Sequence, residues 1–188
     1  MLPVSAPDYV QPVVAWRCWA AAWVDGELRL CSPVYETVWP VRNKVQAECR
    51  ASTKRWLSRQ PPPAHTAPSD GCRCGIYGVD DPSRAVSFVR GQGFVAVPGD
   101  VVETVLGKVL LWGSVVECDH GWRAQCAYPA ALYLSARGPY RTFGLRPPEG
   151  HDRRAALEGV AGHLRSYGVP VHLFADDSLA AVAAALTP

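Results

Sequence analysis

The sequence predicts an α+β fold: a mostly antiparallel twisted sheet or partial β-barrel, with one inserted helix and a C-terminal helix–strand–helix unit. Of its 188 residues, 48% are hydrophobic and 19% are charged, which is typical of a globular protein. Runs rich in β-branched and aromatic residues, separated by turn signals, fill residues 13–135. Helical periodicity replaces them after residue 151. We therefore expect a single domain over residues 1–188, with a β-rich core at 13–135 and a C-terminal subdomain at 151–187.

The first predicted element is a β-hairpin. Residues 13–24 are rich in Val, Trp and Ala, and a second apolar run covers residues 28–31. Asp25-Gly26 lies between the two runs and is a strong signal for a tight hairpin turn. Two antiparallel strands follow from this pattern.

The inserted helix is predicted over residues 42–58. Val45, Cys49 and Trp56 fall on one face at helical spacing. The prolines that follow at 61–63 stop a helix, because proline lacks the backbone N–H. This prediction points Cys49 toward the interior.

Basic residues gather on the same predicted helix. Arg50, Lys54 and Arg55 belong to a stretch, from Arg42 to Arg59, that contains a single acid. One interpretation is a patch for an anion or an acidic partner. The other is an ordinary solvated helix face.

The middle of the chain predicts a strand, a helix and a long hairpin. Residues 76–79 have the composition of a short strand, and Asp80 to Ser83 provide capping residues for a helix that runs through Val89. Residues 94–97 also have strand composition. Strands are then predicted at 101–106, 108–116 and 122–128, with Asp119-His120-Gly121 as the turn, and residues 129–134 continue the sheet.

The C-terminal unit has the clearest local pattern. Asp152 is placed to cap a helix with an apolar stripe, and Gly168 to end it in the left-handed conformation. The stripe consists of Leu157, Val160, Ala161 and Leu164. A strand is predicted at 169–174, followed by a helix through Leu186 that Asp176 or Asp177 caps.

Four residues of metal-ligand type surround a proline-rich loop: Cys49, His65, Cys72 and Cys74. Thiolate sulfur and imidazole nitrogen are the ligands that tetrahedral zinc prefers, and Cys3His is a known structural set. Gly71 and Gly75 flank the Cys-x-Cys pair and allow the tight backbone that this spacing demands. The sequence therefore predicts a structural zinc site, although the usual Cys-x2-Cys knuckle is absent.

Two other interpretations of these residues stay open. Cys72 or Cys74 would serve as the nucleophile of a thiol-dependent enzyme if His65 acted as its base. Alternatively, the four residues only pack around a tight turn. A further group, Glu117 to His120 with Cys126, lies across the predicted hairpin, where Cys118 is expected opposite Arg123 and Cys126 near Val115. A Cys118–Cys126 disulfide would need another register.

Charge and segment composition restrict the functional classes. The net charge of +2 does not indicate nucleic acid. A nucleic-acid-binding module of barrel type stays an alternative, in which tryptophans and tyrosines would stack bases and the basic residues would hold phosphates, instead of the aromatic residues only packing in the core. The relevant tyrosines are Tyr35, Tyr77 and Tyr128. Seven cysteines, an odd number, argue against a complete disulfide framework. We find no signal peptide and no apolar run of the ~20 residues that a membrane span needs, and we expect a soluble cytoplasmic protein.

Several short segments resemble a group of small bacterial proteins of unknown function. The shared pattern is a Trp-Pro pair, a cysteine, and then His-x-x-Pro-x3-Cys-x-Cys-Gly-Ile-Tyr. Here it corresponds to Trp39-Pro40, Cys49 and residues 65–77, with further similar segments at 109–117 and 121–124. The resemblance spans about half of the chain and implies a shared fold core, without an activity. From the Cys/His cluster, and not from this resemblance, we expect a non-enzymatic binding or regulatory module stabilised by the Cys3His zinc site.

Overall fold

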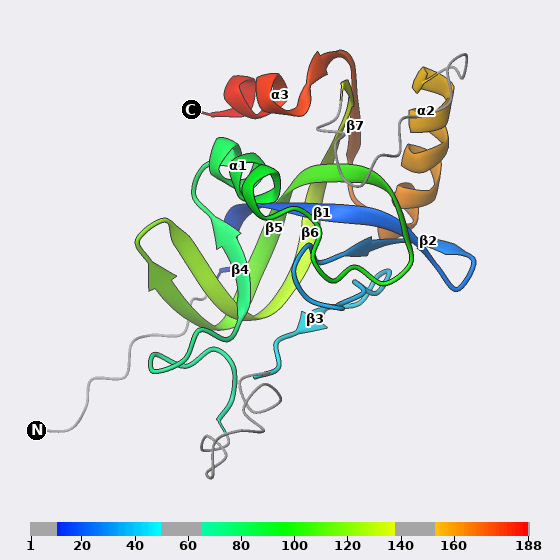
Figure 1. Ribbon diagram of the computed structural model, residues 1–188. Helices are drawn as coiled ribbons and strands as arrows, with labels where there is room; N and C mark the ends of the chain where they lie inside the picture. The colour runs from blue at the N-terminus through cyan, green and yellow to red at the C-terminus, as the bar shows by residue number, and fades with distance from the viewer. Residues whose placement is uncertain (1–10, 50–64, 138–152, 188) are drawn as a thin grey trace, which may run out of the picture.

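The computed structural model describes residues 11–49, 65–137 and 153–187 (Figure 1). It confirms the predicted α+β class, with a mixed seven-stranded sheet and a C-terminal helix–strand–helix unit. No described helix has the length and apolar character needed to cross a membrane. The elements are β1 (Val13–Val24), β2 (Glu27–Cys31), β3 (Val45–Gln46), β4 (Ile76–Val79), α1 (Pro82–Gln92), β5 (Asp100–Cys118), β6 (Gly121–Arg137), α2 (Arg153–Leu164), the 3-10 helix η1 (Arg165–Tyr167), β7 (Val171–Ser178) and α3 (Leu179–Leu186).

Strand β6 organises the sheet. One edge of β6 pairs with β5 along most of its length. The other edge pairs in turn with β4 at residues 121–124, with β3 at 126–127 and with β7 at 132–137. Only the β7 pairing is parallel. Two very short strands, β3 and β4, thus lie next to one another along the same edge of β6.

The sheet curls into a ring that is not a complete barrel. β1 pairs with β5 from Val13 to Trp23, and β4 pairs with both β6 and β1. The contact between β1 and β4 is a single residue pair, Trp16 with Val79. Arg17 Nη1 strengthens this junction by donating to the carbonyl oxygen of Tyr77 at 2.5 Å. The ring is therefore weakly paired at one place, as expected for a partial barrel.

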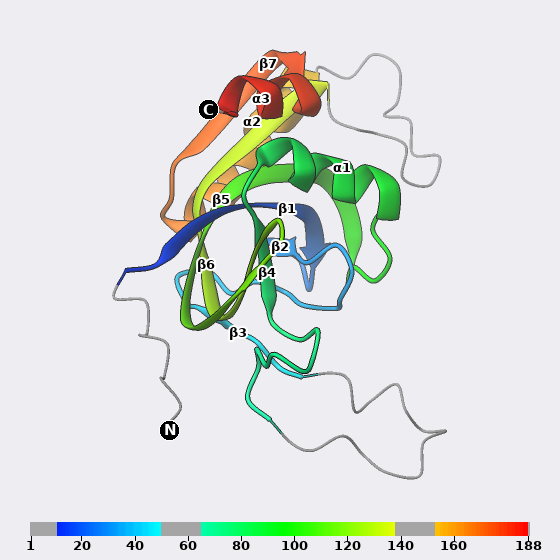
Figure 2. The same cartoon turned by 90° about the vertical axis from the view of Figure 1, so that its left-hand side faces the viewer.

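Two apolar cores lie on opposite faces of β1 because successive strand residues point to opposite sides. Trp19 belongs to the core that also contains Leu157 and Leu164 of α2. Trp16 and Cys18 belong to the second core, which α1 and α3 cover. Figure 2 shows α1 and α3 side by side.

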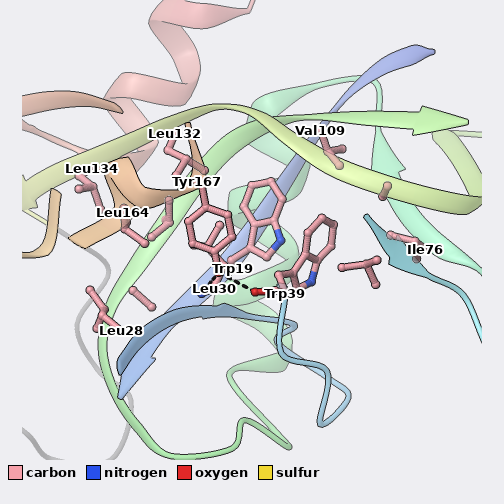
Figure 3. Packing of buried hydrophobic residues seen from close by; sticks show 14 of the residues in the cluster. Trp19, Leu28, Leu30, Trp39, Ile76, Val109, Leu132, Leu134, Leu164 and Tyr167 are labelled. Atoms are coloured by element: carbon pink, nitrogen blue, oxygen red, sulfur yellow. Dashed lines mark hydrogen bonds between the residues drawn. The ribbon is translucent and has the colours of Figure 1, made fainter. Parts of the chain in front are cut away.

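Tyr167 ties the C-terminal unit to the first core (Figure 3). Its hydroxyl donates to the carbonyl oxygen of Trp39 at 2.7 Å and accepts from the backbone N–H of Leu30 at 2.9 Å. The indole rings of Trp19 and Trp39 meet edge to face, with centroids 5.2 Å apart. A single phenol thus satisfies two buried backbone groups on separate segments.

The inserted helix predicted at residues 42–58 is wrong where the structure describes it. Residues 42–49 are not helical: Arg42 has a positive φ of 55°, and Val45 pairs with Ala127 of β6. Pairing with the open edge of β6 wins over the helical periodicity of this segment. The remaining residues, 50–58, lie outside the described part. The inserted helix of the fold is α1, which Asp81 caps as predicted by accepting from the backbone N–H groups of Ser83 and Arg84.

Other boundaries shift by a few residues. Residues 94–97 form bends, so the strand predicted there is wrong. The predicted strands at 101–106 and 108–116 merge into β5, and β6 continues through 129–134. The residue that caps α3 is Ser178, whose hydroxyl accepts from the N–H of Ala181, rather than Asp176 or Asp177.

The predicted end of the first C-terminal helix is confirmed. Gly168 adopts the left-handed conformation directly after η1, with φ 73°. Leu157, Ala161 and Leu164 of the predicted stripe are buried. Asp152, its predicted cap, lies outside the described residues.

Candidate metal centre

Cys49, His65, Cys72 and Cys74 converge at one place. Their ligand atoms all lie within 4.8 Å of one another. Cys49 Sγ is 3.7 Å from Cys72 Sγ, and His65 Nε2 is 3.3 Å from Cys74 Sγ. All four residues are half-buried. The arrangement is compatible with a bound metal ion.

Strand β6 positions both chain segments that supply these ligands. The first ligand segment, residues 45–49, continues from β3, and the N–H of Ala47 donates to the carbonyl oxygen of Gln125 at 2.7 Å. The second ligand segment, residues 65–79, ends in β4, where Ile76 pairs with Ala124. Cys49 therefore reaches the cluster from a loop after β3, and the prediction that it faces inward from a helix is wrong.

Arg123 of β6 holds the loop that carries Cys72 and Cys74. Its Nη1 atom donates to the carbonyl oxygen of Cys74 at 2.9 Å and to that of Ser69 at 3.4 Å. The carbonyl oxygen of Cys72 accepts from the same atom. Because Arg123 is only 8% exposed, its charge lies in the interior immediately behind the cysteine loop. Sequence analysis missed its role, and the available signal was an arginine on a strand otherwise rich in apolar residues.

Gly75 makes the close approach of this loop to β6 possible. Its φ is 125°, a region that side chains disfavour. A Cβ atom at this position would lie 3.0 Å from Arg123 Cβ and 3.2 Å from Pro68 Cβ. Gly71 differs, because a Cβ atom there would meet nothing within 4 Å. Glycine is therefore required at position 75, as predicted. At position 71 a larger side chain would meet no neighbouring atom.

The two thiols of the cysteine loop differ in their pKa. The N–H of Cys72 donates to the carbonyl oxygen of Ser69 at 3.0 Å, which closes a turn. A backbone hydrogen bond from Cys74, with a smaller contribution from Cys49, lowers the pKa of the Cys72 thiol to about 7. Burial, followed by the neighbouring Cys72, raises the pKa of Cys74.

The other cysteines are not members of the cluster. Burial raises the pKa of Cys18 to about 12 and that of Cys31 to about 11, so both are buried thiols. Cys118 is exposed beside the β5–β6 turn and pairs with Gly121, whereas Cys126 pairs with Trp112. The predicted partners, Arg123 and Val115, are wrong because Asp119 and His120 alone form the turn, so Cys118 pairs directly with Gly121. A register shift between Trp112 and Val115 displaces the partner of Cys126 by one further residue. All seven cysteines are free thiols.

The predicted basic patch cannot be placed on this site. Arg50, Lys54 and Arg55 lie outside the described residues. Of the tyrosines considered for nucleic-acid binding, Tyr35 and Tyr77 are exposed, at 46% and 42%. Tyr128 is half-buried in a groove elsewhere on β6.

Comparisons of the chain with models of protein families, with curated proteins and with solved structures found no significant match. The similarity to small bacterial proteins of unknown function stays a prediction from the sequence.

Proposed function

We propose that the protein is a non-enzymatic binding module in which a structural Zn²⁺, held by Cys49, His65, Cys72 and Cys74, fixes the loops beside β3 and β4. The observation that carries this proposal is the spacing of the ligand atoms. Zn–S bonds of ~2.3 Å and Zn–N bonds of ~2.0 Å in a tetrahedron place neighbouring ligand atoms roughly 3.5–3.8 Å apart. The separations of 3.7 Å between sulfurs and 3.3 Å between nitrogen and sulfur are close to this geometry.

The number of ligands supports a structural role for the ion. Four protein ligands complete the coordination of a tetrahedral ion, whereas catalytic zinc keeps a position for water or substrate. A bound ion would also join the end of β3 to the start of β4 across residues 50–64. Because the four ligands converge only in the folded chain, the free energy of metal binding adds to the stability of the fold.

Metal analysis of the purified protein, together with cysteine variants, tests the proposal. We expect about one zinc per chain in the wild-type protein and less than about a tenth of that in Cys74→Ser. Cys18→Ala removes a thiol that lies in the second core, outside the cluster, and should retain the full zinc content. Folded wild-type protein without zinc, or equal zinc loss in both variants, would overturn the proposal.

One contact favours a second candidate, a thiol-dependent enzyme. His65 Nε2 lies 3.3 Å from Cys74 Sγ, which is within reach for a general base acting on that thiol. This role uses two of the four converging residues, so it leaves Cys49 and Cys72 unexplained. Alkylation separates the candidates, because a metal site protects all four residues, whereas an active-site thiol gives one fast-reacting Cys74 in metal-free protein.

A further inference from the structure

A groove lies next to the first ligand segment. Its lining includes Arg42 and Lys44, immediately before β3, and Trp112 and Tyr128 from the paired strands β5 and β6. The open groove has a volume of about 600 Å³, within the ~300–1,000 Å³ typical of ligand sites. Most of its lining is apolar.

Hydrogen bonds hold Arg42 in place beside the groove. The backbone N–H of Arg42 donates to Tyr128 Oη at 2.6 Å, and Tyr128 Oη donates to the carbonyl oxygen of Tyr167 at 2.8 Å. Arg42 Nε donates to the carbonyl oxygen of Ser166 at 3.4 Å. The unusual backbone of Arg42, with φ 55°, is therefore held from both β6 and η1.

The charges of the groove favour an anion. Arg42 and Lys44 are exposed, and within the described ranges no carboxylate lines the groove or pairs with either cation. The indole of Trp112 and the phenol of Tyr128 are half-buried, so they add aromatic surface to the lining of the groove. Aromatic side chains beside basic ones bind the bases and phosphates of single-stranded nucleic acid without strong sequence preference.

We propose that this groove binds single-stranded nucleic acid, with a base stacked on the aromatic lining and phosphates at Arg42 and Lys44. The inference rests on the proposed function, because it names the ligand of the binding module. Its occupant is a strand rather than a free nucleotide because the groove is open and both of its cations are exposed to solvent. The net charge of only +2 means that binding comes from these local groups.

Fluorescence anisotropy with a labelled oligothymidine strand tests this inference. Two phosphate contacts predict a slope of about −1.4 for log K against log salt concentration, and Lys44→Gln should reduce it to about −0.7. The same variant should weaken binding about five-fold at 0.1 M salt. Trp112→Leu should weaken binding about 5- to 150-fold while the slope stays unchanged.

Arg90→Gln is the charge-matched control, because Arg90 is an exposed residue of α1 that does not line the groove. It should bind like the wild-type protein. No binding at 50 mM salt, equal weakening by Arg90→Gln and Lys44→Gln, or equal binding of an abasic strand would overturn the inference. A mononucleotide that binds as tightly as the strand would overturn the choice of a strand.

Zinc content and circular dichroism, measured on the same samples, separate this inference from the proposed function. Zinc-loaded protein without strand binding overturns the groove alone, and zinc-free protein overturns the metal site. A folded Trp112→Leu variant that retains wild-type binding also counts against the groove.

Discussion

Arg123 Nη1 lies 2.9 Å from the carbonyl oxygen of Cys74, so a buried strand residue fixes the backbone of a metal-ligand candidate. Residues behind the ligands of a metal site commonly set ligand orientation, and losing one typically lowers affinity 10- to 100-fold. Arg123 has this position relative to the cysteine loop, although within that loop its side chain contacts carbonyl groups rather than the ligand sulfurs.

Replacing Arg123 with glutamine should therefore weaken zinc binding by about 10- to 100-fold. The glutamine cannot reach all of the carbonyl oxygens that Arg123 now holds, so the loop loses its fixed position. Competition with a chromophoric chelator measures the affinity. Arg73→Gln removes the same charge from an exposed residue of the same loop, and it should change affinity by less than about three-fold. Equal effects would show that the charge acts at a distance.

Adding one methyl group at Gly75 should distort the site. Gly75→Ala brings a Cβ within 3.0 Å of Arg123 and imposes a left-handed φ on a residue with a side chain. We expect lower zinc affinity and a loss of about 1–3 kcal/mol in unfolding free energy. Gly71→Ala is the matched control because it meets open space. Urea denaturation measures the unfolding free energy of both variants. Similar values for the two would contradict the steric argument.

Zinc should raise the stability of the wild-type protein. An ion that binds only the folded state adds about 2.7 kcal/mol to the unfolding free energy when free zinc is at 100 times its Kd. Thermal unfolding with buffered zinc and with chelator gives this difference. Cys49→Ser breaks the ligand set and should lose most of the response. A wild-type melting temperature that zinc does not change would contradict the stabilising role.

Glu103 should make stability depend on pH. It is 2% exposed, pairs with Arg153 at 2.9 Å, and burial raises its pKa from 4.5 to about 7. The folded state binds the Glu103 proton more tightly than the unfolded chain does. The contribution of Glu103 to the unfolding free energy is therefore full below pH 4.5 and decreases between pH 4.5 and pH 7, by about 3 kcal/mol at most.

Glu103→Gln removes this titration and isolates it from the pH dependence of zinc binding. The unfolding free energy of the wild-type protein, relative to that of the variant, should decrease between pH 5 and 8. Urea denaturation across this range, at saturating zinc, measures the difference. Parallel curves for the two proteins would show that Glu103 titrates normally.

Removing the Tyr167 hydroxyl should destabilise the protein by about 1–3 kcal/mol, because the carbonyl of Trp39 and the N–H of Leu30 lose a buried partner. The comparison is Tyr133→Phe, since the Tyr133 hydroxyl makes no hydrogen bond within the described residues. Denaturation midpoints should separate the two variants. If Tyr133→Phe is as unstable as Tyr167→Phe, the loss of stability comes from changed packing and not from the lost hydrogen bonds.

Local patterns were sufficient to predict several elements of this fold. Asp25 and Gly26 both adopt positive φ in the turn between β1 and β2, which is the conformation that their residue types favour. Gly168 likewise ends the C-terminal helical segment as its position indicates. In these places the favoured local conformation and the tertiary contacts agree.

Long-range strand pairing determines the structural features that local sequence patterns did not predict. Val45 and Cys49 have helical spacing, yet the edge of β6 draws Val45 into a strand pair with Ala127, about 80 residues away. Arg123 gained its role in the same way, through a loop 49 residues earlier. The four candidate ligands were recognisable as residue types, whereas the groove could not be predicted because its residues come from three distant parts of the chain.

The position of β6 also has a consequence for the order in which the protein assembles. All four candidate ligands lie within the first 74 residues, but the strand that pairs with both ligand segments begins only at Gly121. During synthesis from the N-terminus, the ligand set is therefore complete well before β6 emerges. The two ligand segments reach their places only when they pair with β6, so an ion that binds the folded state does so after β6 has emerged. Metal binding would then mark the completion of the sheet.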